Sequence, residues 1–171
     1  ILSSLVGSEM CIRDRNDLVA RGYFEAVTFS FVAPEVQTFF DPEPSPIPLK
    51  NPISADLAVM RTSLIPGLLK AIAHNTSRQQ SRVRLFETGL KFTAGEGDAE
   101  QIPMLALAVS GLRDTEGWST EKAAADFFDV KGTVEGLLAN LGDRLTFEVS
   151  VFPGLHDCLL YTSPSPRDSR V

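Results

Sequence analysis

The sequence has few of the residues that most often carry chemistry. Two cysteines, two histidines and one tryptophan occur among its 171 residues. The cysteines, Cys11 and Cys158, stand near opposite ends of the chain, and a cytosolic protein of this length does not need a disulfide to be stable. Because no thiol lies between them, a cysteine cluster for zinc and a cysteine nucleophile are excluded for that stretch.

Long apolar runs and an excess of positive charge are also lacking. No stretch approaches the roughly 18 apolar residues that a membrane-spanning helix needs, and the start lacks the basic region of a secretory signal. Sixteen basic residues against 22 acidic ones give a formal charge of −6, so the composition does not favour a surface for phosphate backbones. We therefore predict a cytoplasmic protein with no membrane contact, and the missing initiator Met predicts a fragment.

The two ends of the chain are related at the level of DNA. Residues 158–168 can be encoded by a strand whose complement, read in a shifted frame, encodes Leu5–Asp14 without a mismatch. Chance does not explain ten matched residues, and the DNA resembles a transposase-type adapter used in sequencing libraries. We therefore expect residues 1–15 and 158–171 to be adapter-derived and residues 16–157 to form one domain, truncated at its C-terminal end.

The first part of this domain is predicted to contain a helix end, a long strand and a short helix. Gly22 stops a helix over Asp17–Arg21, and aromatic and β-branched residues at period two favour a strand over Tyr23–Val32. This strand would place Val27, Phe29 and Phe31 on one face. A short helix over Pro34–Phe40 precedes four alternate prolines, which predict an extended connection; a proline-rich ligand segment is the alternative.

An amphipathic helix is predicted from Ser63 to about Ser77. Leu64, Leu68 and Ile72 recur every four residues, which is the helical period. Thr62 or Ser63 would cap the helix, and the following proline falls in the first turn, where it is tolerated.

The remaining pattern alternates strands with one more helix. The predicted elements are a strand over Arg82–Glu87 continuing to Phe92, an acidic loop over Gly95–Glu100, a central strand over Met104–Ser110 covered on both faces, a helix from Phe127 to Leu141 ending at Gly142, and a last strand through Leu145, Phe147, Val149 and Val151. The fold class is therefore α+β.

Candidate chemical groups are scarce. His74 lies on the polar side of its helix, and a solvated or interface histidine is favoured over a catalytic base. Asp126 and Asp129 flank a helix start, where a capping role is favoured over a metal site. The one basic cluster could touch RNA or form ion pairs. It consists of Arg78, Arg82 and Arg84.

An ordered series of motifs resembles the β subunit of bacterial phenylalanine-tRNA ligases. The matching segments are Leu18–Val32, Asn51–Ser54, Met60–Lys70, Asn75, Arg78–Gln80, Arg82–Gly89, Asp126–Gly132 and Pro153–His156. Asp157 stands where that family has proline, at the edge of the adapter-derived segment. The resemblance covers essentially all of residues 16–156.

The resemblance implies the catalytic-like core module of the β subunit. Its fold would be that of class II aminoacyl-tRNA synthetase catalytic domains, an antiparallel sheet flanked by helices, in a copy that is chemically silent. The whole enzyme would attach phenylalanine to its tRNA with ATP and Mg²⁺ as two α and two β chains, with the active site on α. No catalytic residue, metal ligand or cofactor is expected in this fragment.

The resemblance further implies an assembly role against the α subunit. The interface candidates are Arg61, Leu64, Leu68, Ile72 and Asn75. Packing within the domain's own core explains the same period equally well. Two functions of other classes stay open from the residues alone, namely a free-standing enzyme that uses His74 and an unrelated α+β ligand-binding domain.

Overall fold

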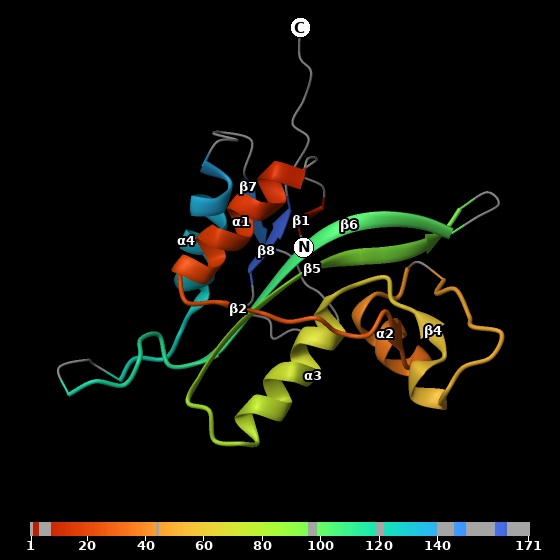
Figure 1. Ribbon diagram of the computed structural model, residues 1–171, viewed down its shortest axis with the longest axis horizontal. Coiled ribbons are helices and arrows are strands. Elements are labelled where there is room, and N and C mark those ends of the chain that lie inside the picture. The colour runs from red at the N-terminus through yellow and green to blue at the C-terminus, as the bar shows by residue number, and fades with distance from the viewer. Residues whose placement is uncertain are drawn as a thin grey trace, which may run out of the picture.

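The computed structural model describes residues 2–3, 8–43, 45–95, 99–118, 122–139, 146–149 and 160–163. Figure 1 shows the helices and strands that these residues form, in their order along the chain. The elements are β1 (Leu2–Ser3), α1 (Ser8–Ala20), β2 (Phe24–Glu25), β3 (Phe31–Val32), α2 (Pro34–Phe40), a 3₁₀ turn (Ala55–Leu57), β4 (Val59–Met60), α3 (Ile65–Thr76), β5 (Arg82–Ala94), β6 (Ala99–Gly111), α4 (Phe127–Leu137), β7 (Thr146–Val149) and β8 (Leu160–Ser163).

A long antiparallel hairpin of β5 and β6 is the centre of the fold. The two strands pair without a break from Arg82 opposite Gly111 to Ala94 opposite Ala99. They are the inner strands of a sheet with the order β1-β6-β5-β2, in which β2 runs parallel to β5. The predicted strands over residues 82–92 and 104–110 are therefore confirmed; residues 96–98 of the predicted acidic loop lie outside the described part of the chain.

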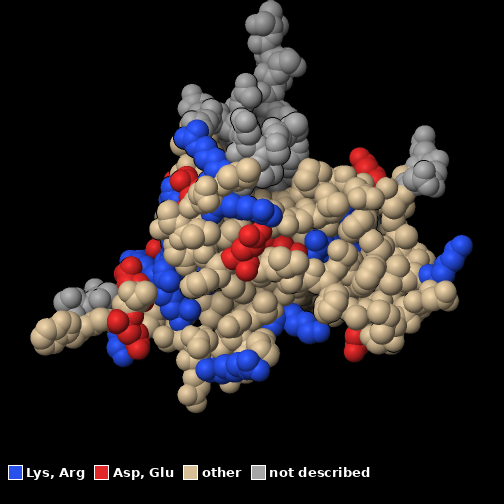
Figure 2. Space-filling view, in the orientation of Figure 1, with Lys and Arg blue, Asp and Glu red and all other residues tan. Residues whose placement is uncertain are grey.

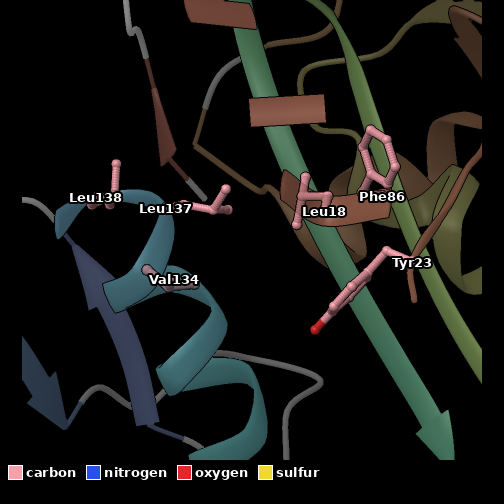
Figure 3. Packing of buried hydrophobic residues seen from close by; sticks show 6 residues of the cluster. All are labelled: Leu18, Tyr23, Phe86, Val134, Leu137 and Leu138. Carbon is pink, nitrogen blue, oxygen red and sulfur yellow. The ribbon is translucent and has the colours of Figure 1, made fainter. Parts of the chain in front are cut away.

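Helices cover both faces of the hairpin, as the unbroken apolar pattern of β6 predicted. Successive strand residues point to opposite faces. Phe86 therefore packs with α1 and α4, while Leu85 packs with Leu64 and Leu68 at α3. Figure 3 shows the first cluster, formed by Leu18, Tyr23, Phe86, Val134, Leu137 and Leu138. Figure 1 shows α1 and α4 together on one side of the hairpin and α3 on the other.

The predicted strand over Tyr23–Val32 is wrong in extent and in the face that it buries. Two residues pair with β5 and two with β4, and the residues between them are irregular. Val27 and Phe29 are 90% and 72% exposed. The strand is interrupted because Thr28 turns inward to hydrogen-bond Glu87, which leaves its apolar neighbours facing outward.

Two helix boundaries also differ from prediction. The N-cap of α3 is Leu64, whose side chain cannot cap; the hydroxyl of Ser63 instead accepts the N–H of Ile65 at 3.2 Å. Thr62 points away from the helix, to Gln37 and Asp41. The other helix, α4, ends at Leu137, short of the predicted end; Leu141, Gly142, Leu145 and Val151 lie outside the described residues.

The segments expected to be adapter-derived contribute to three elements. α1 begins at Ser8, and β1 and β8 pair with β6 and β7. Residues 8–15 contain no Gly or Pro, so a helix can continue through them whatever their origin. That origin stays a prediction. Among the described residues, no helix is long and apolar enough to cross a membrane.

Candidate functional site

A buried ion pair lies between the start of α3 and strand β5. A terminal nitrogen of Arg61 is 2.7 Å from a carboxylate oxygen of Glu87, and the two side chains are only 5% and 2% exposed. The carboxylate also accepts the N–H of Thr28 at 3.2 Å and its hydroxyl at 2.8 Å. A buried charge is tolerated only when it is paired and hydrogen-bonded, and this pair meets both conditions.

Arg61 connects three segments through its backbone as well as its side chain. Its N–H donates to the Ser30 carbonyl and its own carbonyl accepts the N–H of Phe92, both at 2.9 Å. Its Nε donates to the carbonyl of Leu90 at 2.9 Å. The residue therefore ties the irregular segment after β2 to the middle of β5.

A second set of polar side chains adjoins the pair at Thr62. The N–H of Thr62 donates to the side-chain carbonyl of Gln37 at 3.1 Å, and its hydroxyl donates to Asp41 at 2.5 Å. The amide nitrogen of Gln37 donates back to the same hydroxyl oxygen. Gln37 is fully buried, so these bonds fasten α2 to the start of α3. We refer to Thr28, Gln37, Asp41, Arg61, Thr62 and Glu87 as the polar network.

Two glycines make room for this network. A Cβ at Gly67 would overlap Thr28 Oγ1 and lie 2.8 Å from its Cβ, and a Cβ at Gly89 would overlap the guanidinium of Arg61. Neither glycine has a positive φ, so space rather than backbone conformation requires glycine at both positions. The motifs around Arg61, Gly67 and Glu87–Gly89 thus meet at one place in the fold.

The network is built for structure rather than for reaction. Its charged groups are bonded to each other and buried, which leaves no free nucleophile or base among them. Within the described ranges, no group of three or more His, Cys, Asp or Glu side chains could hold a metal ion.

The predicted interface residues fall into two groups. Arg61, Leu64 and Leu68 are 4%, 1% and 0% exposed and contact this chain's own sheet. Ile72 and Asn75 are half-buried, and Asn75 donates to the carbonyl of Ala71 at 2.8 Å. The structure therefore accounts for the first group by core packing, and a contact of α3 with a partner stays a prediction.

The aspartates at the start of α4 form a cap, as favoured from the sequence. Asp126 accepts the N–H groups of Phe128 and Asp129, and Asp129 accepts the N–H of Asp126. A terminal nitrogen of Arg113 lies 2.9 Å from a carboxylate oxygen of Asp126, and its Nε lies 3.1 Å from one of Asp129. Burial alone would raise the pKa of the Asp129 carboxyl, but the Asp126 N–H and the Arg113 guanidinium outweigh it and lower that pKa.

The predicted basic cluster divides in the structure. Arg78 is exposed. Arg82 and Arg84 are half-buried, and both donate to the backbone carbonyl of Arg113, at 3.2 and 2.7 Å. Among the described residues, none of the three has a carboxylate within ion-pair distance, so ion pairing does not account for this cluster.

His74 is exposed on α3, as predicted. The hydroxyl of Ser77 donates to the backbone carbonyl of His74 and not to its imidazole. Over the described part of the chain its imidazole has no acidic partner to orient it as a base, so its surroundings do not resemble those of a catalytic histidine.

Sequence reasoning misses most of the polar network. It places Glu87 in a strand without a role, although a single acid between apolar strand residues is a signal of burial with a partner. Gln37 and Thr28 carry no such signal, because polar residues are ordinary in short helices and loops. Their roles depend on contacts distant in sequence.

Comparison with known proteins agrees with the fold. Residues 12–159 match the family described as the phenylalanyl tRNA synthetase beta chain CLM domain. The chain is also similar in fold to a pyrrolysyl tRNA synthetase, PylSc of Desulfitobacterium hafniense, with a TM-score of 0.59 and 18% identity over 84% of this chain and 49% of that one. The expected α+β fold of class II synthetase catalytic domains is confirmed.

Curated relatives are phenylalanine-tRNA ligase beta subunits. That of Pseudomonas putida is 51% identical over 144 residues, and that of Pseudoalteromonas translucida is 48% identical over 147. Each alignment covers 83% of this chain but 18% of the relative, so the chain spans less than a fifth of those proteins. The chain belongs to the phenylalanyl-tRNA synthetase beta chain CLM domain family.

Proposed function

We propose that this domain is a catalytically silent assembly module of a phenylalanine-tRNA ligase beta subunit, packing against the alpha subunit. In the whole enzyme, two alpha and two beta chains would attach phenylalanine to its tRNA in the cytoplasm, using ATP and Mg²⁺ on the alpha chain. The relatives named above support the beta-subunit identity, and a beta subunit implies a partner.

The chemistry of the central sheet supports a silent module. An adenylate-forming site needs arginines that are free to contact ATP phosphates and carboxylates that are free to hold the metal. Arg61 and Glu87 are the charged pair buried at the sheet, and each is bonded to the other. This pair therefore can supply neither the free arginine nor the free carboxylate that such a site needs.

An exposed apolar segment carries the assembly proposal. Phe24, Val27 and Phe29 are 70%, 90% and 72% exposed within six consecutive residues. Clustered exposed apolar groups of this size mark protein interfaces. Figure 1 shows the segment between β2 and α2 running across the front of the molecule, and the same region is mostly uncharged in Figure 2. We assign the alpha subunit as the protein that packs on this segment, because the relatives are subunits of a complex.

Replacing Phe29 by Asp in the complete beta subunit, co-expressed with alpha, tests this assignment. Because Phe29 is exposed, the variant should fold with a melting temperature close to that of the wild type and fail to co-elute with alpha on a sizing column. The matched control is Phe128→Asp, since Phe128 is 71% exposed on α4 and an acidic residue is favourable in a first helical turn. The control should assemble normally.

Intact assembly of the Phe29→Asp variant would contradict the docking surface. The silent character of the module is tested separately by phenylalanine-dependent exchange of pyrophosphate into ATP. The 171-residue chain alone should show no exchange and the complete enzyme should show it. Exchange by the chain alone, abolished by His74→Ala, would restore the free-standing enzyme as the better explanation.

A further inference from the structure

Two arginines at one end of the central hairpin share a single neutral acceptor. Arg82 and Arg84 are alternate residues of β5, so their side chains leave the same face of the sheet. Both guanidinium groups donate to the carbonyl oxygen of Arg113. The carbonyl carries no full negative charge, and among the described residues neither guanidinium has a carboxylate within ion-pair distance.

The described surroundings of the pair hold it in place without supplying an anion at ion-pair distance. Arg84 lies over the ring of Tyr23, with its Cζ 5.6 Å from the ring centroid, and the Arg82 guanidinium packs beside the backbone of Gly22. The nearest acids are already used or distant. Asp126 and Asp129 bind the Arg113 side chain. Asp129 also interacts electrostatically with Arg84, and Asp114 with Arg82, but both act beyond ion-pair distance.

Arg84 also carries a buried polar atom without a partner. Its Nε is inaccessible to solvent and has no hydrogen-bond acceptor in the structure. A buried unsatisfied donor on a cation is costly and calls for an explanation such as an absent ion. The pKa of the Arg82 guanidinium is lowered by burial and then by the neighbouring Arg84 charge, which together outweigh the opposing effect of Asp114.

We infer that Arg82 and Arg84 form a binding site for a phosphodiester group of an RNA backbone. The inference rests on the proposed function, since the whole enzyme must hold tRNA. Planar guanidinium groups match the oxygens of a phosphate with paired hydrogen bonds, and RNA presents phosphates in a row at the surface of the chain. Figure 2 shows basic side chains on the left of the molecule, with acidic side chains beside them, where Figure 1 places the end of α1, β2 and the nearby part of α4.

The salt dependence of tRNA binding tests the site. In the complete enzyme, Arg82→Gln and Arg84→Gln should each reduce the slope of log K against log salt by about 0.7–0.9 for each phosphate that the variant no longer neutralises. The ratio of wild-type to variant affinity should then fall about threefold between about 50 and 200 mM salt. Lys50→Gln removes the same charge from the exposed connection between α2 and β4, and should leave the slope unchanged.

A variant with charge retained separates binding from folding. Arg84→Lys should keep most of the salt slope, because binding a phosphate needs the charge. If Arg84→Gln unfolds, Arg82→Gln still tests the site, because it leaves the contact between Arg84 and Tyr23 intact. Unchanged slopes in an enzyme that assembles and aminoacylates would overturn the site while leaving the proposed function in place. Dissociation of the alpha subunit from both Gln variants, with the Phe29→Asp enzyme still assembled, would show that the arginines bind carboxylates of alpha, and would overturn RNA binding.

Discussion

Replacing Glu87 by Gln should destabilise this domain more than almost any other change of a single atom. The amide keeps an oxygen that can accept from Thr28, but it removes the charge that faces Arg61 at 2.7 Å. The guanidinium, 5% exposed, then stays charged without a counterion. The perturbation is therefore electrostatic and leaves the volume of the side chain unchanged.

The magnitude follows from the burial of both partners. Breaking a buried pair by removing one charge costs about 3–5 kcal/mol, against a total stability of about 5–15 kcal/mol for a domain. At about 2–4 °C per kcal/mol for a domain of this size, the melting temperature should fall by roughly 10 °C. Glu135→Gln is the control, because Glu135 pairs with Lys131 at 3.6 Å on the surface of α4, and should cost below about 0.5 kcal/mol.

Urea unfolding followed by far-UV circular dichroism gives the free energies of unfolding. Fluorescence is a poor reporter because Trp118, the one tryptophan, is fully exposed. A double-mutant cycle adds Arg61→Met and the variant that carries both changes. The double variant lacks the uncompensated charge, so its loss of unfolding free energy should be at least about 2 kcal/mol smaller than the sum of the losses in the two single variants.

Two results would refute this reasoning. A loss below about 1 kcal/mol in Glu87→Gln would mean that water reaches the guanidinium and that the pair is not buried in solution. Additive single variants would mean that Arg61 contributes through its bond to the Leu90 carbonyl rather than through the carboxylate.

Two further predictions concern neighbouring features. In Gly67→Ala the added Cβ overlaps Thr28, so Thr28 must move away from the Glu87 carboxylate. The free energy of unfolding should fall by about 1–3 kcal/mol. A fall below about 0.5 kcal/mol would mean that the segment around Thr28 moves aside without strain. For Asp129 the folded pKa lies below the unfolded value. Its stabilisation is therefore complete above pH about 4 and is lost as the pH falls through the folded pKa. Asp129→Asn should have a lower melting temperature at about pH 7 and a smaller further loss on acidification from about pH 5 to 3; parallel curves for the two proteins would contradict the role of this carboxyl.

Local pattern was sufficient where the chain packs against one apolar surface. The period of α3, the alternation in β5 and the unbroken apolar run in β6 predicted those elements, because the same side chains form both the pattern and the core. The capping acids of α4 were recognisable for a similar reason, since donor and acceptor lie within three residues of each other.

The segment from Val27 to Ser30 was beyond such reasoning. Its apolar alternation is that of a buried strand, yet its conformation depends on Thr28 meeting an acid 59 positions away. No local propensity contains that contact. The same limit applies to one of the two predicted caps of α3: Thr62 is bonded to a side chain 25 positions earlier, while Ser63, the other, accepts the N–H of Ile65.

The buried ion pair also bears on how the hairpin chooses its alignment. Both faces of β5 and β6 are apolar over most of their length. Sliding one strand by a single residue would therefore exchange one apolar face for another at a modest cost in free energy. Such two-sided strands are weakly protected against slippage. Glu87 opposes Ala106 in the observed register, and it meets Arg61 only when β5 presents this face to α3. A slipped strand would carry its acid to the face of Leu18 and Phe86 and leave Arg61 buried without its carboxylate, so this one ion pair distinguishes the correct alignment from its neighbours.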